Sequence, residues 1–292
     1  MMKYIYFINR FSLKEDSDRL IAALERVCGR SDRDYEIVVS NSIAEHNAAL
    51  ERFKEGGYIL CAIGGDGSIN LLLNDIVKTD NVLSFIPYGT GNDFYRYCKE
   101  SGLQGQNSID LIRINERYFL NVACFGIDAD IANDDNFIHN RFIPRPLRYD
   151  AGVVYYFLTY KPRKMRIEIN GELIERKFTT LVAANARYYG GGYRVSPYSD
   201  IADGKMEVLL ADELPKPHMA KVITSMKDAS HLKDPAMHLY ETSKCVISAD
   251  EPFKANIDGE TIEASRFELQ LLPEAYALEF DDGFISEVLA AI

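Results

Sequence analysis

The stretch Ile63-Gly64-Gly65-Asp66-Gly67-Ser68-Ile69-Asn70 stands between a run typical of a buried strand and a run typical of a helix. Two consecutive glycines let the backbone approach a ligand without a Cβ clash, and their N–H groups can converge on phosphate oxygens. Ser68 is placed to cap the helix, whose N-terminus favours negative charge. Asp66 fits such a loop if it holds Mg²⁺ or accepts a proton from a substrate hydroxyl. The alternative is a tight strand-to-helix turn with a solvated aspartate.

A second loop of the same kind is Pro87-Tyr88-Gly89-Thr90-Gly91-Asn92-Asp93-Phe94, which again follows a strand pattern and precedes a helix pattern. It is not a Walker A loop, because no lysine follows the glycines. On its own it is compatible with a simple capped helix start, with Asn92 or Asp93 as the N-cap. Two such loops after adjacent strands share one edge of a sheet, so together they predict a nucleotide-phosphate site.

The first part of the chain alternates strand and helix patterns. Three of its strand runs are almost continuously apolar, which is typical of a parallel sheet buried on both faces. Together the alternating elements predict a doubly wound, mostly parallel α/β domain. The expected strands are 3–8, 35–39, 58–63 and 82–86, and the expected helices are one that stops at Gly29 and others at 44–53, 69–77 and 92–101.

Near residue 125 the pattern changes to short strands separated by turn residues. The hairpin signals are Asn115-Glu116 and Asn170-Gly171, the second being a strong two-residue turn. Many short strands with few helices predict an antiparallel β-sandwich. Further strands are expected at 180–185, 205–210, 244–248, 253–257, 267–272 and 277–280, and helices at 147–160, 218–229 and 284–291.

Composition limits the classes of function. The 292 residues carry 33 basic and 44 acidic side chains, a net charge of −11, which argues against nonspecific nucleic-acid binding. Five scattered cysteines without a C-x-x-C pair make zinc and a disulfide framework improbable and fit a reducing cytoplasm. No apolar run has the length of a membrane span, and the N-terminus is typical of a strand rather than of a signal peptide. We therefore expect a cytoplasmic globular protein.

The two glycine loops resemble those of the diacylglycerol kinase catalytic-domain family, which includes bacterial lipid kinases and sphingosine kinases. The second loop separates this family from NAD kinases and phosphofructokinases. The resemblance continues through Tyr189-Gly190-Gly191-Gly192, Ser196-Pro197, Asp200, Asp203-Gly204 and Ile257-Asp258-Gly259-Glu260. It implies an ATP-binding α/β domain of residues 1–124, joined by the C-terminal segment 283–292, and a β-sandwich lipid-substrate domain of residues 125–282.

The resemblance also implies which residues contact ATP. The first loop after strand one departs from the family, because Asn9-Arg10-Phe11-Ser12-Leu13-Lys14 lacks the usual proline and glycine. Ser40 and Ser68 stand where threonine is usual, and both keep a hydroxyl. The expected nucleotide contacts are Asn9, Ser40, Gly64, Gly65, Asp66, Gly67, Ser68, Asn70, Gly89, Thr90, Gly91 and Asn92.

Metal and proton-transfer roles follow from the same resemblance. Asp66, Asp93 and Asp128 would form a carboxylate and water network around the catalytic Mg²⁺, with Asp130 as a rival for Asp128. Asp66 is thus a catalytic candidate as well. The general base would be Asp258 or Glu260, across an interdomain cleft from the loops; the alternative for Asp258-Gly259 is a plain hairpin turn. A second, structural cation would be held by Asp200, Asp203 and the carbonyl oxygen of Lys205.

Residues 137–166 combine seven basic side chains and one acid with the aromatic run 153–160. This pattern suits peripheral docking on anionic headgroups, and an ordinary core helix with solvated ends is the alternative. The leading hypothesis is an ATP- and Mg²⁺-dependent lipid kinase that acts on a diacylglycerol- or phosphatidylglycerol-like hydroxyl and is peripherally bound to a membrane. A homodimer is left open. The alternatives are a soluble-substrate kinase of the NAD-kinase type and a catalytically silent lipid or nucleotide sensor.

Overall fold

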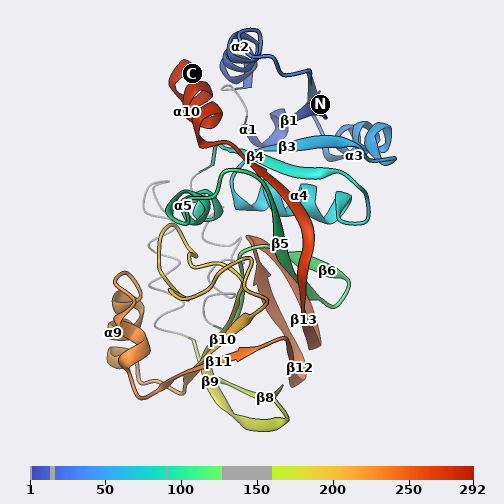
Figure 1. The fold of residues 1–292 in the computed structure, drawn as a ribbon. Helices are drawn as coiled ribbons and strands as arrows, with labels where there is room; N and C mark the ends of the chain where they lie inside the picture. The colour runs from blue at the N-terminus through green and yellow to red at the C-terminus, as the bar shows by residue number, and fades with distance from the viewer. Residues whose placement is uncertain (1, 14–16, 90, 127–159) are drawn as a thin grey trace, which may run out of the picture. The chain divides into compact units, whose positions relative to one another are not determined.

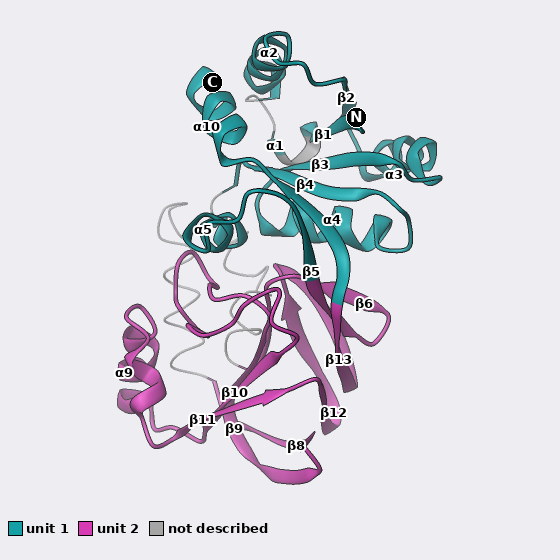
Figure 2. Cartoon of the chain, viewed as in Figure 1, with its two compact units in different colours: residues 1–109, 274–292 teal, residues 110–273 magenta. Residues whose placement is uncertain are grey.

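The structure is a computed structural model, and it describes the chain except for residues 1, 14–16, 90 and 127–159 (Figure 1). The described residues form two compact units, unit 1 with residues 1–109 and 274–292 and unit 2 with residues 110–273 (Figure 2). Both boundaries fall earlier than the expected 124 and 282. The reason is that strands β5 (Gly105–Ile114) and β13 (Glu260–Phe280) each have residues in both units. A strand that crosses a domain boundary without interruption leaves no signal of that boundary in the sequence.

Unit 1 contains four parallel strands in the spatial order β2-β1-β3-β4. Each lies where the sequence predicted a strand, and β1 and β3 are buried along almost their whole length, which explains their continuous apolar runs. Near its end β13 adds one further parallel pairing, between Leu278 and Leu83. The four strands are β1 (Lys3–Asn9), β2 (Tyr35–Ser40), β3 (Tyr58–Gly64) and β4 (Val82–Pro87).

Helices lie on both faces of these strands. Tyr6 and Phe7 are consecutive in β1, so their side chains point to opposite faces. The Tyr6 ring stacks on Phe284 of α10 (Asp282–Ala291) at 6.0 Å, whereas the Phe7 ring meets His46 of α3 (Ile43–Leu50) at 5.3 Å. The remaining helices of unit 1 are α1 (Arg10–Leu13), α2 (Ser17–Cys28), η2 (Glu51–Phe53), α4 (Asp66–Ile76) and α5 (Asp93–Glu100).

One helix of unit 1 was not predicted. The four-residue helix α1 follows β1 directly, in the stretch that the sequence analysis treated as an irregular loop. The absence of proline and glycine in this stretch is what permits a helical turn there, because both residues disfavour helix interiors.

Unit 2 is built from antiparallel pairs, as predicted. The Asn170-Gly171 turn joins β8 and β9 as expected, and its φ values of 51° and 81° are those of a hairpin turn that needs two left-handed residues. Besides β5 and β13, the elements are β6 (Arg117–Phe119), β7 (Val122–Gly126), β8 (Arg163–Ile169), β9 (Glu172–Ala184), β10 (Met206–Asp212), α9 (Lys216–Ser225), η4 (Ser230–Lys233), β11 (Met237–Thr242) and β12 (Lys244–Ile257).

The strand prediction for unit 2 was wrong in two respects. The expected strands 244–248 and 253–257 are one strand, β12, whose register with β13 shifts between Ser248 and Phe253. Likewise 267–272 and 277–280 both belong to β13, and 180–185 continues β9. Strand β11 was missed because it is buried at only one end and its sequence mixes charged and apolar residues. The expected helix 147–160 lies outside the described residues, apart from Tyr160.

Unit 2 buries both faces of its central strands. Leu181 and Ala183 of β9 point into one core, whereas Val182 and Ala184 pack with α9 in a second. The first core centres on three aromatic rings, with Phe267 at 5.3 Å from Phe125 and 5.0 Å from Phe253. Two buried faces explain why these strands lack a clean apolar–polar alternation.

Two further features of the structure concern its cysteines and the length of its helices. All five cysteines are free and buried. Across the part of the chain that the structure describes, no helix is long and apolar enough to span a membrane.

We predict that Phe267→Ala lowers the free energy of unfolding of unit 2 by about 3–5 kcal/mol, since it removes a fully buried ring and leaves a cavity. Urea denaturation of the full chain measures it. The control is Leu173→Ala at a side chain that is 64% exposed, for which a change within about 0.5 kcal/mol is expected. Equal effects of the two substitutions would contradict this account of the core.

Candidate functional site

Both glycine loops leave the same edge of the unit 1 sheet. Gly64, the last residue of β3, is in register with Pro87, the last residue of β4. On the other side of β3, Asn9 ends β1 and is in register with Ser40, which ends β2. The carboxyl ends of four neighbouring parallel strands therefore carry the candidate nucleotide residues, at the edge where open α/β sheets bind ligands.

The two loops touch each other through glycine backbone. A Cβ at Gly89 would lie 2.5 Å from the Gly65 Cα and 2.6 Å from its nitrogen, a distance that no side chain tolerates. The Tyr88 N–H also donates to the Gly64 carbonyl oxygen at 2.9 Å. Glycine is thus required at position 89 so that the second loop can pack against the first.

Asp66 joins the loops by capping helix α5. Its Oδ2 accepts the N–H of Asp93 at 2.9 Å and its Oδ1 accepts the N–H of Phe94 at 3.0 Å. These are the first two residues of α5, whose N–H groups have no intrahelical partner. Asn92 occupies the N-cap position, as the alternative of a simple capped helix start had it, but its side chain makes no capping bond, and the capping carboxylate stands 27 residues before Asp93.

Asn92 instead closes the second loop on itself. It has a left-handed φ of 50°, a conformation that asparagine tolerates better than most residues. Its Oδ1 accepts the N–H of Gly89 at 3.2 Å, and its Nδ2 donates to the Gly89 carbonyl oxygen at 2.9 Å. Asn92 is therefore bonded back to both backbone polar groups of Gly89. Thr90 lies outside the described residues.

The prediction that Ser68 caps α4 was also wrong. Helix α4 begins at Asp66, its N-cap position is Gly65 without a side-chain bond, and Ser68 is inside the first turn, with its N–H donating to the Gly65 carbonyl oxygen at 2.9 Å. Asn70 follows in the next turn, where it is fully buried and its Oδ1 accepts from Asn74 at 3.0 Å. Of the first-loop candidates, Gly64, Gly65, Asp66 and Gly67 thus stand at the helix start.

Buried polar side chains lie at the ends of β1 and β2. Asn9 is 6% exposed and Ser40 is 1% exposed, and the Ser40 hydroxyl has no hydrogen-bond partner among the described residues. His46 of α3 is buried as well, and burial lowers its pKa, so that its ring stays neutral. Sequence reasoning missed His46, although a histidine on the apolar face of a helix pattern was a visible signal.

Asp258 and Glu260 have different environments. Asp258-Gly259 is the two-residue hairpin turn that joins β12 to β13, with left-handed φ values of 48° and 94°. The Asp258 carboxylate is buried and accepts backbone N–H groups from Leu120 at 2.8 Å, from Asn121 at 3.2 Å and from Val122 at 2.8 Å. It thereby holds the start of β7 against the hairpin.

The Glu260 carboxylate forms an ion pair with Arg117 of β6, and its side chain is 27% exposed. It is therefore more accessible than Asp258 and is oriented by a cation. Arg117 was missed by sequence reasoning, because it stands in a hairpin strand without a motif.

The loop with Asp200, Asp203 and Lys205 is held by a hydrogen bond to a carboxylate that sequence reasoning also missed. Asp110 is 1% exposed, and its Oδ2 accepts the Gly204 N–H at 2.7 Å. Burial, together with repulsion from Asp200 and Asp110, raises the pKa of Asp203. Burial raises the pKa of the neighbouring Glu207 to about 7. Acidic side chains are thus gathered around this loop.

The carboxylates offer no preformed metal cage: in the described part of the chain, no three His, Cys, Asp or Glu side chains are arranged to hold a metal ion. Asp93 is buried and accepts from Arg96 Nη1 at 3.1 Å, and Asp128 and Asp130 lie outside the described residues. Each Asp66 oxygen accepts one backbone hydrogen bond and keeps a second lone pair. That donor fits Mg²⁺ bound by one carboxylate together with phosphate oxygens and water.

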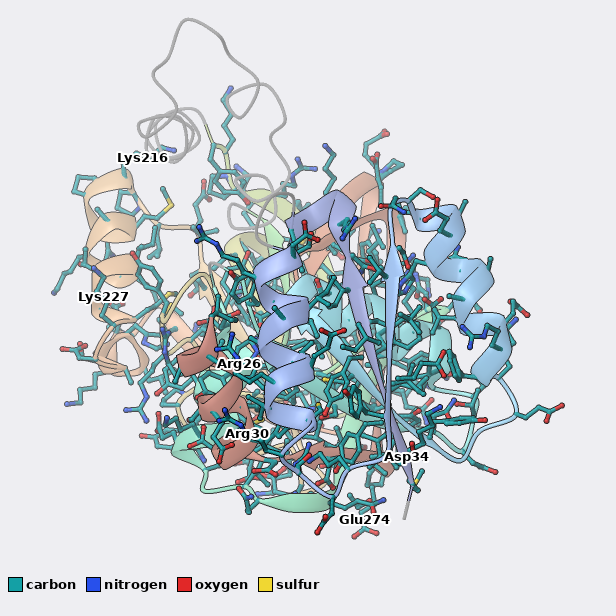
Figure 3. The ribbon with its side chains drawn as sticks, turned by 90° about the horizontal axis from the view of Figure 1, so that it is seen from above. Arg26, Arg30, Asp34, Lys216, Lys227 and Glu274 are labelled. Atoms are coloured by element: carbon teal, nitrogen blue, oxygen red, sulfur yellow. The ribbon has the colours of Figure 1, made fainter. Side chains whose placement is uncertain are left out.

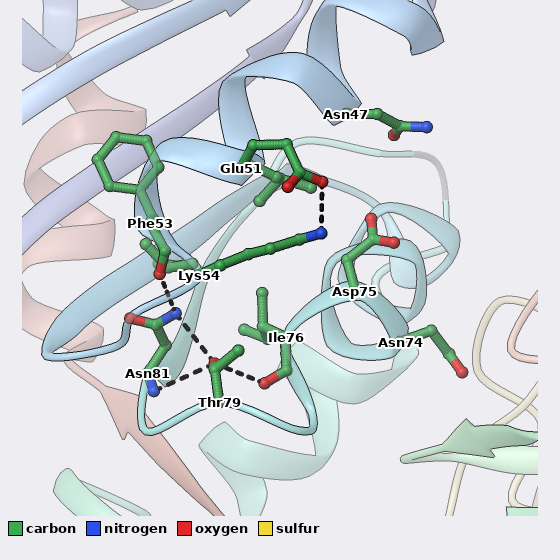
Figure 4. Close-up of a pocket in the computed structure, with 11 residues that line it drawn as sticks. Asn47, Glu51, Phe53, Lys54, Asn74, Asp75, Ile76, Thr79 and Asn81 are labelled. Atoms are coloured by element: carbon green, nitrogen blue, oxygen red, sulfur yellow. Dashed lines mark hydrogen bonds and ion pairs between the residues drawn. The ribbon is translucent and has the colours of Figure 1, made fainter.

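A cavity of about 250 Å³ in unit 1 is separate from the glycine loops (Figure 4). It is lined by Asn74, Asp75 and Ile76 in the last turn of α4, whereas Asp66 is the first residue of that helix. Its rim is occupied by the Lys54–Glu51 ion pair and by Asn81, whose Nδ2 donates to the Phe53 carbonyl oxygen at 2.8 Å. None of the residues that line this cavity is among the candidate nucleotide residues.

The basic aromatic segment 137–166 lies mostly outside the described residues. Within its described end, Lys164 pairs with Glu175, and Arg166 pairs with Glu175 at 3.3 Å and with Asp250 at 2.8 Å. These two cations are compensated by acids of the neighbouring strands, so they contribute little net positive charge to a surface.

Comparison with known families divides the chain into two matched parts. The family described as "Diacylglycerol kinase catalytic domain" matches residues 3–120. The family described as "YegS C-terminal NAD kinase beta sandwich-like domain" matches residues 121–279, more than half of the chain. The second part is thus a β-sandwich-like domain that follows a catalytic domain.

Individual proteins agree with this division. A protein named "Diacylglycerol kinase" from Bacillus subtilis is 25% identical over 237 residues, 74% of either chain. A "Probable lipid kinase YegS-like" from Alcanivorax borkumensis is 27% identical over 257 residues, 80% of this chain and 82% of its own. The crystal structure of a putative diacylglycerol kinase from Bacillus anthracis superposes with a TM-score of 0.73 at 16% identity and covers 97% of this chain and 96% of its own. At that identity the superposition shows the fold alone.

We predict that Gly89→Ala lowers the free energy of unfolding of unit 1 by about 1–3 kcal/mol, because the new methyl group would force the loops apart. The matched control is Gly65→Ala. Its Cβ would meet the Gly89 Cα at 3.5 Å, an ordinary contact, and its φ of −91° suits alanine. Thermal unfolding of both variants measures the contrast, and a control that lost as much stability as Gly89→Ala would refute the close approach.

Proposed function

The chain belongs to the lipid-kinase family that joins a diacylglycerol kinase catalytic domain to a YegS-type C-terminal domain, and on this premise we propose its reaction and the residues that perform it. The protein is a kinase that uses ATP to phosphorylate a hydroxyl group of a lipid. The acceptor in the proposal is a diacylglycerol- or phosphatidylglycerol-like alcohol. Its hydroxyl oxygen attacks the γ-phosphorus of ATP, the bond from that phosphorus to the bridging oxygen breaks, and ADP leaves.

The observation that carries the proposal is the pair of glycine loops locked together by Asp66. The two loops and the N-termini of α4 and α5 stand at one edge of the sheet, and helix N-termini favour negative charge. In the proposal the ATP phosphates bind there. Asn9 and Ser40, at the ends of β1 and β2, extend the same edge and supply polar groups for the rest of the nucleotide.

Asp66 has two roles in the proposed site. Its oxygens fix the start of α5, and their remaining lone pairs would bind Mg²⁺ directly or through water. When bound, Mg²⁺ neutralises charge on the phosphate oxygens. The Asp93 carboxylate accepts a hydrogen bond from Arg96, so it would act on the ion only through water.

Proton transfer is assigned to the 258–260 hairpin. Protonation of Asp258 would weaken three hydrogen bonds from backbone N–H groups. Among the described residues, the Glu260 carboxylate accepts no such bond and pairs with Arg117. We therefore prefer Glu260 as the base that accepts the hydroxyl proton of the lipid, with Arg117 orienting its carboxylate.

Several finer features stay part of the proposal. Unit 1 is taken as a doubly wound α/β nucleotide domain, on the basis of its four parallel strands and of helices on both faces. Asp200, Asp203 and the Lys205 carbonyl oxygen are taken as ligands of a structural cation, supported by the acidic side chains gathered around them. Peripheral membrane docking through 137–166, a cytoplasmic location and a homodimer rest on sequence arguments alone.

We predict that the purified protein transfers label from ATP to one of diacylglycerol, phosphatidylglycerol or sphingosine in mixed micelles with Mg²⁺. Asp66→Asn should lower the rate by about 10- to 100-fold, because the amide keeps one acceptor and loses the charge. The matched control is Asp75→Asn in the last turn of the same helix, for which an unchanged rate is expected.

The same assay separates the alternatives. Labelled NADP from NAD offered in solution would move the assignment to a soluble-substrate kinase of the NAD-kinase type. Binding of ATP without transfer to any acceptor would favour the silent lipid or nucleotide sensor. Equal loss in Asp66→Asn and Asp75→Asn would contradict the role given to Asp66.

We predict opposite signatures for two substitutions in the 258–260 hairpin. Glu260→Gln should lower kcat by at least about 100-fold at unchanged Tm, as expected for loss of a general base. Asp258→Asn should lower Tm, because an amide presents one acceptor oxygen to the three N–H groups and turns its own N–H₂ toward them. A stable, inactive Asp258→Asn beside an active Glu260→Gln would instead make Asp258 the base.

A further inference from the structure

The C-terminal segment of the chain contacts the helix that begins at the second glycine loop. Strand β13 ends at Phe280, Asp281 is the N-cap of α10, and Asp282 is the first residue of that helix. All three belong to unit 1, as does α5. The last part of the sequence thus packs against a nucleotide-site element that stands almost 200 residues earlier.

Polar contacts fix this packing. The Tyr95 hydroxyl donates to Asp282 Oδ1 at 2.9 Å, and Lys99 Nζ lies 3.5 Å from Asp282 Oδ2. Tyr95 and Lys99 are four residues apart in α5 and therefore lie on one face of the helix. Asp282 is thus held by two side chains of α5. Burial and the bond to Asp282 raise the pKa of Tyr95, so its hydroxyl keeps the donated proton at neutral pH.

Aromatic contacts continue from the segment to the first turn of α5. The Phe280 ring lies 6.1 Å from Tyr95 and 5.7 Å from Phe85 of β4. Phe85 in turn lies 5.5 Å from Phe94, whose backbone N–H is bound by Asp66. The first turn of α5 is therefore held by its backbone through Asp66 and by its side chains through the C-terminal segment.

The segment is anchored independently of α5. The Arg33 guanidinium pairs with Asp281 and lies over the Phe284 ring at 3.8 Å and the Tyr4 ring at 4.5 Å. Arg26, labelled in Figure 3, donates from α2 to the Ala291 carbonyl oxygen at 3.4 Å. These contacts tie α10 to β1 and α2, so Asp282 is a fixed point against which α5 can be positioned.

We propose that Tyr95 and Asp282 are positioning residues for ATP binding. Through their contact the C-terminal segment holds the start of α5 and the second glycine loop in a fixed position relative to the first loop. The inference rests on the proposed function, because it takes the glycine loops as the ATP site. Loss of the contact lets α5 move relative to Asp66. The backbone N–H groups that meet the phosphates then lose their fixed spacing, whereas the residues given a role in proton transfer are not touched.

The test compares Tyr95→Phe and Asp282→Ala with the wild-type full-length protein. Direct calorimetric titration of Mg-ATP, without lipid, should give a dissociation constant about three- to tenfold higher in each variant. The double variant should be no weaker than Asp282→Ala alone, since both changes remove the same contact. In the kinase assay KM for ATP should rise, with kcat and KM for the lipid unchanged.

Two further variants separate positioning from general loss of stability. Tyr276→Phe is the matched control, because it also removes one hydrogen bond of a tyrosine hydroxyl. The hydroxyl of Tyr276, in β13, donates at 3.0 Å to the carbonyl oxygen of Ile76 in the last turn of α4. Its ATP dissociation constant should stay within about twofold of the wild-type value. Asp282→Asn should restore most of the affinity, because its amide oxygen still accepts the Tyr95 hydroxyl.

Wild-type affinity in Tyr95→Phe, or an equal loss in Tyr276→Phe, would overturn the proposal. So would an Asp282→Asn variant as weak as Asp282→Ala. A wild-type protein that binds ATP and phosphorylates no lipid would overturn the proposed function alone, because the titration needs no lipid. Failure of the wild type to bind ATP would overturn both.

Discussion

The hydrogen bonds from the Asp66 carboxylate to the first two N–H groups of α5 are the contact on which the proposed nucleotide site depends. Each glycine loop alone is a turn between a strand and a helix. The carboxylate makes them one structure, because it belongs to the first loop and caps the helix that follows the second. The close approach of Gly65 and Gly89 serves the same end, since any Cβ at position 89 would hold the loops apart.

Carboxylates that bind backbone N–H groups recur in unit 2. Asp258 accepts three of them at the start of β7, and Asp110 accepts that of Gly204. Buried acids are costly unless they are hydrogen-bonded, and a backbone N–H group is a donor that no side-chain substitution removes. Acidic residues that a motif marks as chemical can therefore carry structure, or structure and chemistry together. Asp66 has both roles in the proposed site, whereas the contacts of Asp258 favour structure.

The sequence predicted much of this arrangement, and its errors have identifiable causes. The four parallel strands and the Asn170-Gly171 hairpin follow from short-range signals, namely apolar runs and turn residues. The merging of predicted strands into β12 and β13 does not, because a polar interruption that the partner strand absorbs by a register shift looks like a loop. The capping oxygens of α5 could not be found from the sequence for a related reason, since propensity looks for a cap next to the helix and these oxygens come from Asp66.

By itself the sequence determined the class of the protein: glycines at the ends of predicted strands, in two loops of defined spacing, indicate a phosphate site and carry the resemblance to lipid kinases. Local chemistry suffices for this, because a backbone that approaches phosphate needs glycine whatever surrounds it. Only the tertiary structure decided which partner each acid takes, that Arg117 holds Glu260, and that Asp282 holds α5. The last two pairings join residues more than a hundred positions apart, and no local pattern encodes a contact that exists only after the chain has folded.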